Sequence, residues 1–152
     1  MTLTQKETSL LNDLKSQEQL CIEKYGKYAE TANDPALSAM FREIQSAEES
    51  HLKTVCQILS GKEVSMPSES PSATAAKRSC ELSPCNANER ADDAFLCRDA
   101  LSMEKHVSSV YDTSVFEFTS PVLRDTLAHI QKEEQNHGEM LYNYLDCNNM
   151  YS

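Results

Sequence analysis

The sequence contains two Glu-x-x-His motifs, and a lone glutamate precedes each of them on an earlier stretch of the chain. Residues three apart on a helix point the same way, so each motif could hold a metal ion through a carboxylate and an imidazole. Helical bundles that bind two metal ions use this set, with one glutamate from each of two helices and a Glu-x-x-His from each of the other two. The six candidate ligands are Glu18, Glu48, His51, Glu104, Glu134 and His137.

The candidate ligands recur at a constant interval. Glu18, Glu48 and His51 each find the same residue type 86 positions later, and residues 10–59 repeat weakly in that register without a gap. The other retained identities are Leu10, Asp13, Ser16, Tyr25, Pro35, Leu37, Ile44, Gln45 and Leu59. Most of the retained residues are apolar stripe positions or candidate ligands. The interval therefore predicts a duplicated helical hairpin.

The electrostatics of such a site require a cation. An ionised carboxylate buried without a partner costs several kcal/mol even after relaxation, and four carboxylates together would repel one another. Two divalent cations would cancel this charge, and carboxylate-rich sites favour iron or manganese. One Glu-x-x-His in a glutamate-rich helix could arise by chance, but two in equal phase, each preceded by a stripe glutamate, favour a metal site. We predict two divalent metal ions, iron or manganese.

The elements that must position these residues are helices. Low glycine and proline content and long stretches of good helix formers predict an all-α protein. One hairpin is expected over residues 3–60 and a second over residues 89–148, with Pro35 and Pro121 at the first position of their second helices. Residues 61–88, rich in proline and serine, form the predicted linker. A long crossover there would make residues 1–152 a single antiparallel four-helix bundle.

Charge and composition limit the partners. A net charge of −10 and a pI near 4.8 argue against nucleic acid or an anionic membrane as a partner. No stretch approaches the roughly 20 apolar residues of a membrane span, and the N-terminus has no leader pattern, so a cytoplasmic protein is expected. Apolar residues such as Phe95 and Phe116, if exposed, would allow a homodimer.

Several other residues have two interpretations. Tyr25 and Tyr111 lie two turns after the lone glutamates, where they could hydrogen-bond ligand carboxylates or simply fill the core. His106 and His129 have no histidine counterpart in the other half and are expected to be surface or packing residues. The six cysteines are expected to be reduced, with cross-linking in a coat-like assembly as the alternative.

The order Glu, Glu-x-x-His, Glu, Glu-x-x-His resembles the ferritin-like superfamily, which includes rubrerythrins and bacterioferritins. This resemblance spans nearly the whole chain apart from the linker, and it implies a carboxylate-bridged di-iron or di-manganese centre. The segment PVLRDTLAHIQKEEQNHGEMLYNYL, together with the Ser-x-Glu segments at Ser16 and Ser102, is most similar to the spore coat protein F family. That similarity implies a spore coat location, with other spore coat proteins as partners.

Two functions remain open at this point, and the sequence leaves it undecided whether the protein is an enzyme. One is a metal-binding or structural protein of the spore coat. The alternative is a rubrerythrin-like oxidase or peroxidase in oxidative-stress defence. Rubrerythrin-like peroxidases usually have an extra glutamate one turn after the third-helix ligand, where this chain has Val107, and the equivalent first-helix position is Cys21. The chain also lacks a rubredoxin-like four-cysteine module.

Overall fold

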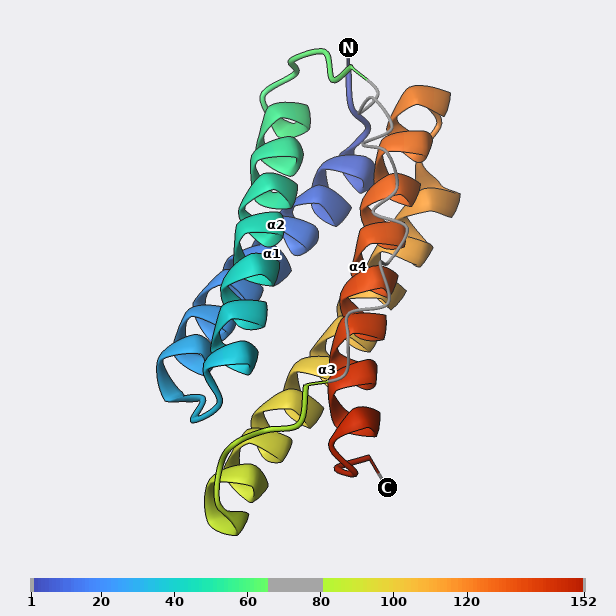
Figure 1. Ribbon diagram of the computed structural model, residues 1–152. Helices are drawn as coiled ribbons and strands as arrows, with labels where there is room; N and C mark the ends of the chain where they lie inside the picture. The colour runs from blue at the N-terminus through green and yellow to red at the C-terminus, as the bar shows by residue number, and fades with distance from the viewer. Residues whose placement is uncertain (1, 66–80, 152) are drawn as a thin grey trace.

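The protein folds into four helices packed as two antiparallel hairpins. The structure is a computed structural model that describes residues 2–65 and 81–151. The helices are α1 (Gln5–Thr31), α2 (Pro35–Leu59), α3 (Ala87–Glu117) and α4 (Pro121–Cys147). The described residues form no strand. The predicted all-α class and four-helix bundle are therefore confirmed, with α1 and α2 in one hairpin and α3 and α4 in the other (Figure 1).

Each helix begins at a residue whose side chain caps it. Thr4 accepts a hydrogen bond from the backbone of Glu7, which bonds back to Thr4 in a capping box, and Asn86 does the same for α3. In α2 and α4 an Asp34 or Ser120 cap is followed by proline at the start of the helix. The third helix therefore begins at Ala87, slightly before the predicted boundary.

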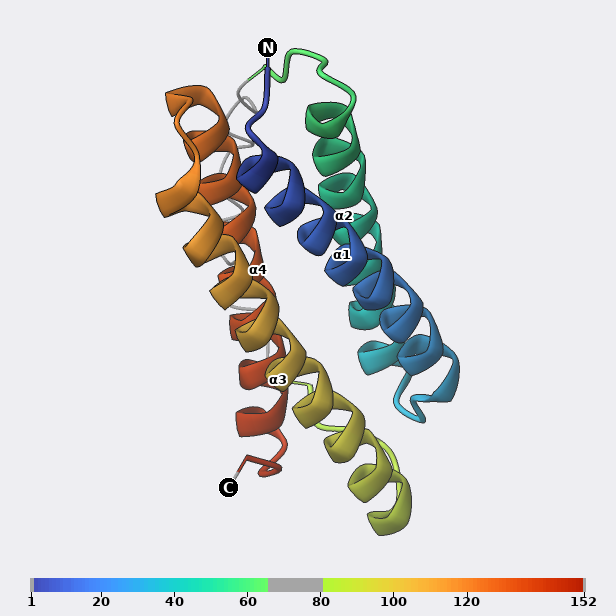
Figure 2. The ribbon, with the colours of Figure 1, turned by 180° about the vertical axis from the view of Figure 1, so that it is seen from behind.

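The two hairpins pack against each other mainly through α1 and α3. Figure 2 shows these two helices side by side on the face turned towards the viewer. The helices α2 and α3 run in the same direction, so α3 begins at the opposite end of the bundle from the end of α2 (Figure 1). This is the arrangement that the predicted crossover requires, although residues 66–80 of the predicted linker lie outside the described residues.

Buried carboxylates tie each hairpin to the turn of the other. Asp93 on α3 is fully buried and accepts hydrogen bonds from the backbone N–H groups of Asn33 (2.8 Å) and Asp34 (2.9 Å), between α1 and α2. Its counterpart 86 positions earlier, Glu7, accepts a bond from the backbone N–H of Thr119 (3.0 Å), between α3 and α4. Both carboxylates thus satisfy turn donors that would otherwise lack partners.

Replacing Asp93 by alanine should lower the free energy of unfolding by about 2–4 kcal/mol, because buried backbone donors would lose a charged acceptor. The matched control is Asp92→Ala, which removes the same charge from the exposed neighbouring position and should change stability by less than about 0.5 kcal/mol. Urea denaturation followed by circular dichroism would measure both. Equal effects of the two substitutions would contradict this account of the turn.

Among the described residues, four cysteines are free and one is disulfide-bonded. Cys21, Cys56, Cys85 and Cys97 are free thiols, as expected, but Cys147 is disulfide-bonded, so the expectation of reduced cysteines is wrong for that residue.

Phe95 and Phe116 are exposed, with 65% and 82% of their surface accessible. In the part of the chain that the structure describes, no helix is both long and apolar enough to cross a membrane.

Candidate metal centre

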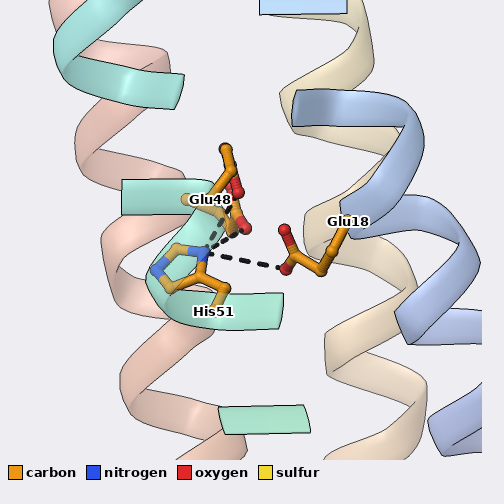
Figure 3. A group of neighbouring side chains, drawn as sticks. Glu18, Glu48 and His51 are labelled. Carbon is orange, nitrogen blue, oxygen red and sulfur yellow. Dashed lines mark hydrogen bonds and ion pairs between the residues drawn. The ribbon is translucent and has the colours of Figure 1, made fainter. Parts of the chain in front are cut away.

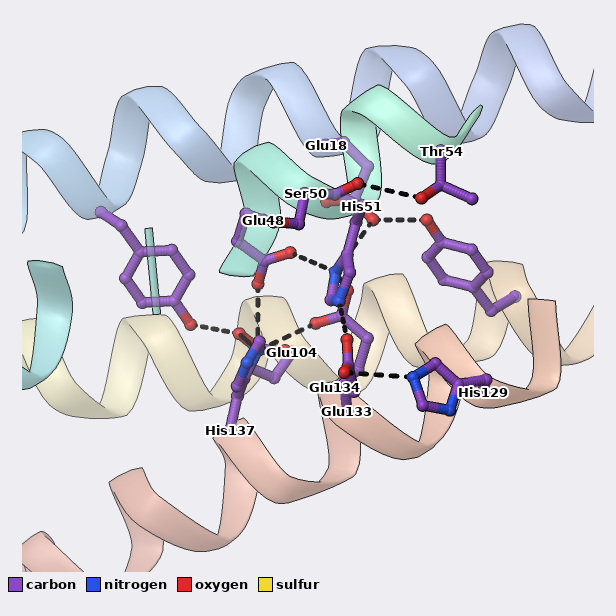
Figure 4. A network of polar contacts seen from close by, with 12 residues as sticks. Glu18, Glu48, Ser50, His51, Thr54, Glu104, His129, Glu133, Glu134 and His137 are labelled. Carbon is purple, nitrogen blue, oxygen red and sulfur yellow. Dashed lines mark hydrogen bonds and ion pairs between the residues drawn. The ribbon is translucent and has the colours of Figure 1, made fainter. Parts of the chain in front are cut away.

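All six predicted ligands meet in the middle of the bundle. Each is buried, and the most exposed of them, His137, has 7% of its surface accessible. Every helix takes part, since α1 and α3 each provide a glutamate, whereas α2 and α4 each provide a glutamate and a histidine one turn later (Figure 4). The packing of the helices therefore brings all six candidate ligands together in two overlapping groups.

The six side chains form two overlapping groups. One consists of Glu18, Glu48, His51 and Glu134, and the other of Glu48, Glu104, Glu134 and His137. Within each group, one ligand atom from every residue lies within 4.8 Å of the others. Glu48 and Glu134 belong to both groups, whereas Glu18 and Glu104 belong to one each. The structure thus distinguishes shared carboxylates from terminal ones, which the sequence left open.

The imidazole of His51 faces the first group through its Nδ1 atom (Figure 3). This atom lies 3.1 Å from Glu48 Oε2, 3.1 Å from Glu134 Oε1 and 3.7 Å from Glu18 Oε1. Three carboxylates from three helices therefore surround one ring nitrogen. A cation near this nitrogen would have one imidazole and three carboxylates within reach.

His137 repeats this arrangement on the other side. Its Nδ1 lies 3.2 Å from Glu48 Oε1, 3.5 Å from Glu104 Oε1 and 3.4 Å from Glu134 Oε2. The two imidazole rings are stacked, with centroids 5.9 Å apart. The site consequently has the same internal symmetry as the sequence.

Three carboxylate oxygens in the site are buried without a hydrogen bond. Among the described residues these are Glu18 Oε2, Glu104 Oε2 and Glu134 Oε2, the last of which has only the longer 3.4 Å ion-pair contact with His137 Nδ1. Buried polar atoms in folded proteins nearly always have a partner, so each such oxygen calls for an explanation. Direct coordination of a cation would satisfy all three, and the donor set of carboxylate oxygens and imidazole nitrogens fits iron or manganese.

The pKa values of both terminal glutamates are raised. Burial, and then the negative charge of Glu48, raises the pKa of Glu18 to about 10. Burial raises the pKa of Glu104 to about 7, with the hydrogen-bonded Glu134 adding to the effect. A proton is therefore the substitute for a metal ion at these two positions.

The shared glutamates and the histidines form the ionised part of the site. Burial pushes the pKa of Glu48 upward, but hydrogen bonds from His137 and His51 outweigh it and hold the pKa below its usual value. Burial disfavours the charged form of His51, yet hydrogen bonds to Glu133, Glu134 and Glu48 raise its pKa well above the usual value. The metal-free site is thus neutralised partly by imidazolium groups, whose Nδ1 protons a metal ion would displace.

Metal affinity should consequently rise with pH. Glu18 and Glu104 have raised pKa values and are protonated at or below neutral pH, so a metal ion must displace those protons. We expect the apparent affinity for Mn(II) to increase by about tenfold per pH unit for each proton released. Titrations between about pH 6 and pH 8, in buffers of different ionisation enthalpy, would count the protons. An affinity independent of pH would contradict the proposed proton displacement.

Three of the six candidate ligands lie in a segment that is similar to a known family. Residues 92–152 match the family model of the Coat F domain. They include Glu104, Glu134 and His137, the ligands that α3 and α4 provide. The remaining candidate ligands, on α1 and α2, lie before the matched segment.

The fold of the whole chain is ferritin-like. It matches the crystal structure of a two-domain protein from Anabaena variabilis that contains DJ-1/ThiJ/PfpI-like and ferritin-like domains. The TM-score is 0.70 at 20% sequence identity, over 94% of this chain and 40% of the other, so this chain spans less than half the length of that protein. A comparison with curated protein sequences gives no match. The ferritin-like resemblance inferred from the sequence is therefore confirmed for the fold.

Two tyrosines link the second hairpin to the first. Tyr25 on α1 donates a hydrogen bond to Glu104 Oε1, and Tyr111 on α3 donates one to Glu18 Oε1. Both rings are fully buried, so each tyrosine fills the core and also hydrogen-bonds a candidate ligand carboxylate. Each terminal glutamate is oriented by the opposite hairpin, which leaves its second oxygen directed at no protein donor.

The positions one turn beyond the terminal glutamates are apolar. Val107 and Cys21 are buried, with 0% and 2% of their surface accessible. Burial and the neighbouring carboxylates raise the pKa of Cys21, so its thiol remains protonated and is a poor metal ligand. Neither position can supply the extra carboxylate of rubrerythrin-like peroxidases.

Glu133 is a neighbour of the site that the sequence analysis did not identify. Its Oε2 lies 2.5 Å from His51 Nε2, and its Oε1 lies 3.2 Å from Nε2 of His129, which is half-buried rather than a simple surface residue (Figure 4). The sequence does distinguish this position: Glu133 directly precedes the second Glu-x-x-His motif, whereas Ala47 precedes the first. His106 is exposed, as expected.

Proposed function

We propose that this ferritin-like protein binds two divalent metal ions, iron or manganese, and is of the spore coat protein F type. The observation that supports the proposal most strongly is the pair of overlapping groups of buried ligands. Glu18 and His51 would serve one ion, Glu104 and His137 the other, and Glu48 and Glu134 both. The full ligand set is therefore Glu18, Glu48, His51, Glu104, Glu134 and His137.

Elemental analysis of protein purified without chelator would test this proposal, both as isolated and after anaerobic loading with Fe(II) or Mn(II). We expect about two ions per chain, as in other carboxylate-bridged centres. The comparison is a double variant, Glu48→Ala with His137→Ala, which should bind neither ion. Absence of metal from the loaded wild-type protein would refute the proposal.

A location in the spore coat is the biological part of the proposal. It is supported by the match of residues 92–152 to the family model of the Coat F domain. The exposed Phe95 and Phe116, both within that domain, offer apolar surface to other spore coat proteins or to a second copy of the chain. Fractionation of spores from a host that produces a tagged chain would test the location. Recovery of the chain only in the core fraction would count against it.

An oxidase or peroxidase is the second candidate, because each metal position would have only four protein ligands. Iron in carboxylate and imidazole sites with open coordination positions supplies redox chemistry towards oxygen. Rapid oxidation of two loaded Fe(II) ions by one equivalent of peroxide, lost in the double variant, would support an oxidative-stress role. Iron that stays reduced under peroxide would exclude it.

A further inference from the structure

The internal symmetry of the site is broken at one residue. Glu133 on α4 contacts the Nε2 atom of His51 on α2. The equivalent contact for His137 would come from position 47, where alanine has no acceptor, and no hydrogen bond to His137 Nε2 is found among the described residues. Among the described residues, His51 therefore has a carboxylate at its Nε2 atom, whereas His137 has none.

Glu133 is held in position rather than free to rotate away. Its Oε2 accepts from His51 Nε2 at 2.5 Å, while His129, one turn earlier on α4, lies 3.2 Å from the other oxygen. In the first half the residues at these two positions are Glu43 and Ala47, so the pair is not repeated. The carboxylate side chain is 39% exposed, which places it at the edge of the bundle.

A carboxylate that accepts a hydrogen bond from the other ring nitrogen of a ligand histidine changes how that histidine binds metal. When Nε2 donates to the carboxylate, the lone pair for the metal is fixed on Nδ1, the ring orientation is set and the imidazole becomes more basic. Removing such a partner typically costs 10–100-fold in metal affinity. His51 is already arranged in this way, with Nδ1 towards the carboxylates of the site and Nε2 towards Glu133.

We propose that the two metal positions are inequivalent: the position built on His51 binds its ion more tightly than the one built on His137, and Glu133 sets the difference by orienting His51. This proposal rests on the proposed two-metal function. It assigns Glu133 a positioning role, since the residue acts through His51 and belongs to neither ligand group. It also predicts an order of filling, with the His51 position first.

Repulsion between two bound cations would separate two binding steps even in a symmetric site, so each position must be measured alone. His137→Ala leaves the position of His51, and His51→Ala leaves the position of His137. Mn(II) titrations followed by the electron paramagnetic resonance of the free ion would give the two affinities. We expect the His137→Ala protein to bind Mn(II) about 10–100-fold more tightly than the His51→Ala protein.

Glu133→Ala in the His137→Ala background should remove most of that advantage. The matched control is Glu139→Ala, which removes the same charge from an exposed position of α4 and should leave the affinity within about twofold. The converse change, Ala47→Glu in the His51→Ala background, should tighten binding by supplying His137 with the missing acceptor. Circular dichroism would show that every variant keeps its helices.

The outcomes separate this proposal from the proposed function. Equal affinities of the two single-position proteins, or an effect of Glu133→Ala no larger than that of Glu139→Ala, would overturn the inequivalence while leaving two-metal binding intact. A wild-type chain that binds no Mn(II) would overturn both the inequivalence and the proposed two-metal function. A His51→Ala protein that binds more tightly than His137→Ala would reverse the proposed order and so refute it.

Discussion

Glu48→Ala should leave the protein unable to retain either metal ion, whereas Glu18→Ala should cost it only one. Glu48 belongs to both ligand groups, and Glu18 to a single group. Loss of a directly coordinating carboxylate should exceed the roughly 10–100-fold effect of losing a residue behind a ligand. We therefore expect metal content to fall from about two ions per chain to none in Glu48→Ala and to one in Glu18→Ala.

The control for this pair is Glu49→Ala, which removes a charge at the exposed position beside Glu48. It should keep both ions. Metal content by elemental analysis, on samples whose helix content is checked by circular dichroism, would measure the series. A Glu48→Ala protein that keeps two ions would show that the overlap of the two groups does not correspond to shared ligands.

Removal of metal should strongly destabilise the protein. A ligand present at 1,000 times its dissociation constant stabilises the folded state by about 4 kcal/mol, so two ions together contribute about 8 kcal/mol. For a chain of this size each kcal/mol shifts the melting temperature by about 2–4 °C, so chelation should lower it by roughly 15–30 °C. The physical source is the set of buried carboxylates, three of whose oxygens have no hydrogen bond without a cation.

Thermal unfolding with and without a strong chelator would measure this effect. The double variant Glu48→Ala with His137→Ala provides the comparison, because its melting temperature should respond neither to chelator nor to added metal. A wild-type protein that melts at the same temperature in both conditions would contradict a stabilising metal centre.

The sequence predicted the helices and the meeting of the candidate ligands because both depend on periodicity. The retained positions at an interval of 86 residues fix which face of each helix points inward, and Glu18, Glu48 and His51 lie on those faces. Their convergence is observed, whereas their role as metal ligands stays a prediction. The division into shared and terminal glutamates followed only from the packing of the helices.

Other features depended on contacts that periodicity does not describe. A glutamate at position 7 gives no sequence indication of burial, yet Glu7 is 2% exposed because the backbone N–H of Thr119, in the turn between α3 and α4, donates to its carboxylate. Glu133 lies off the repeated positions, and its partner is on a different helix. Cys147 is disulfide-bonded, and the spacing of the cysteines alone could not determine which thiols are oxidised.

Anomalous X-ray diffraction from crystals of the metal-loaded protein would test the central claim most directly. We predict two peaks in the middle of the bundle about 3.5–4 Å apart, as in other two-metal sites. One should lie between Glu18 and His51 and the other between Glu104 and His137, with Glu48 touching both. Absence of any peak among these side chains, or peaks confined to surface carboxylates, would contradict the account.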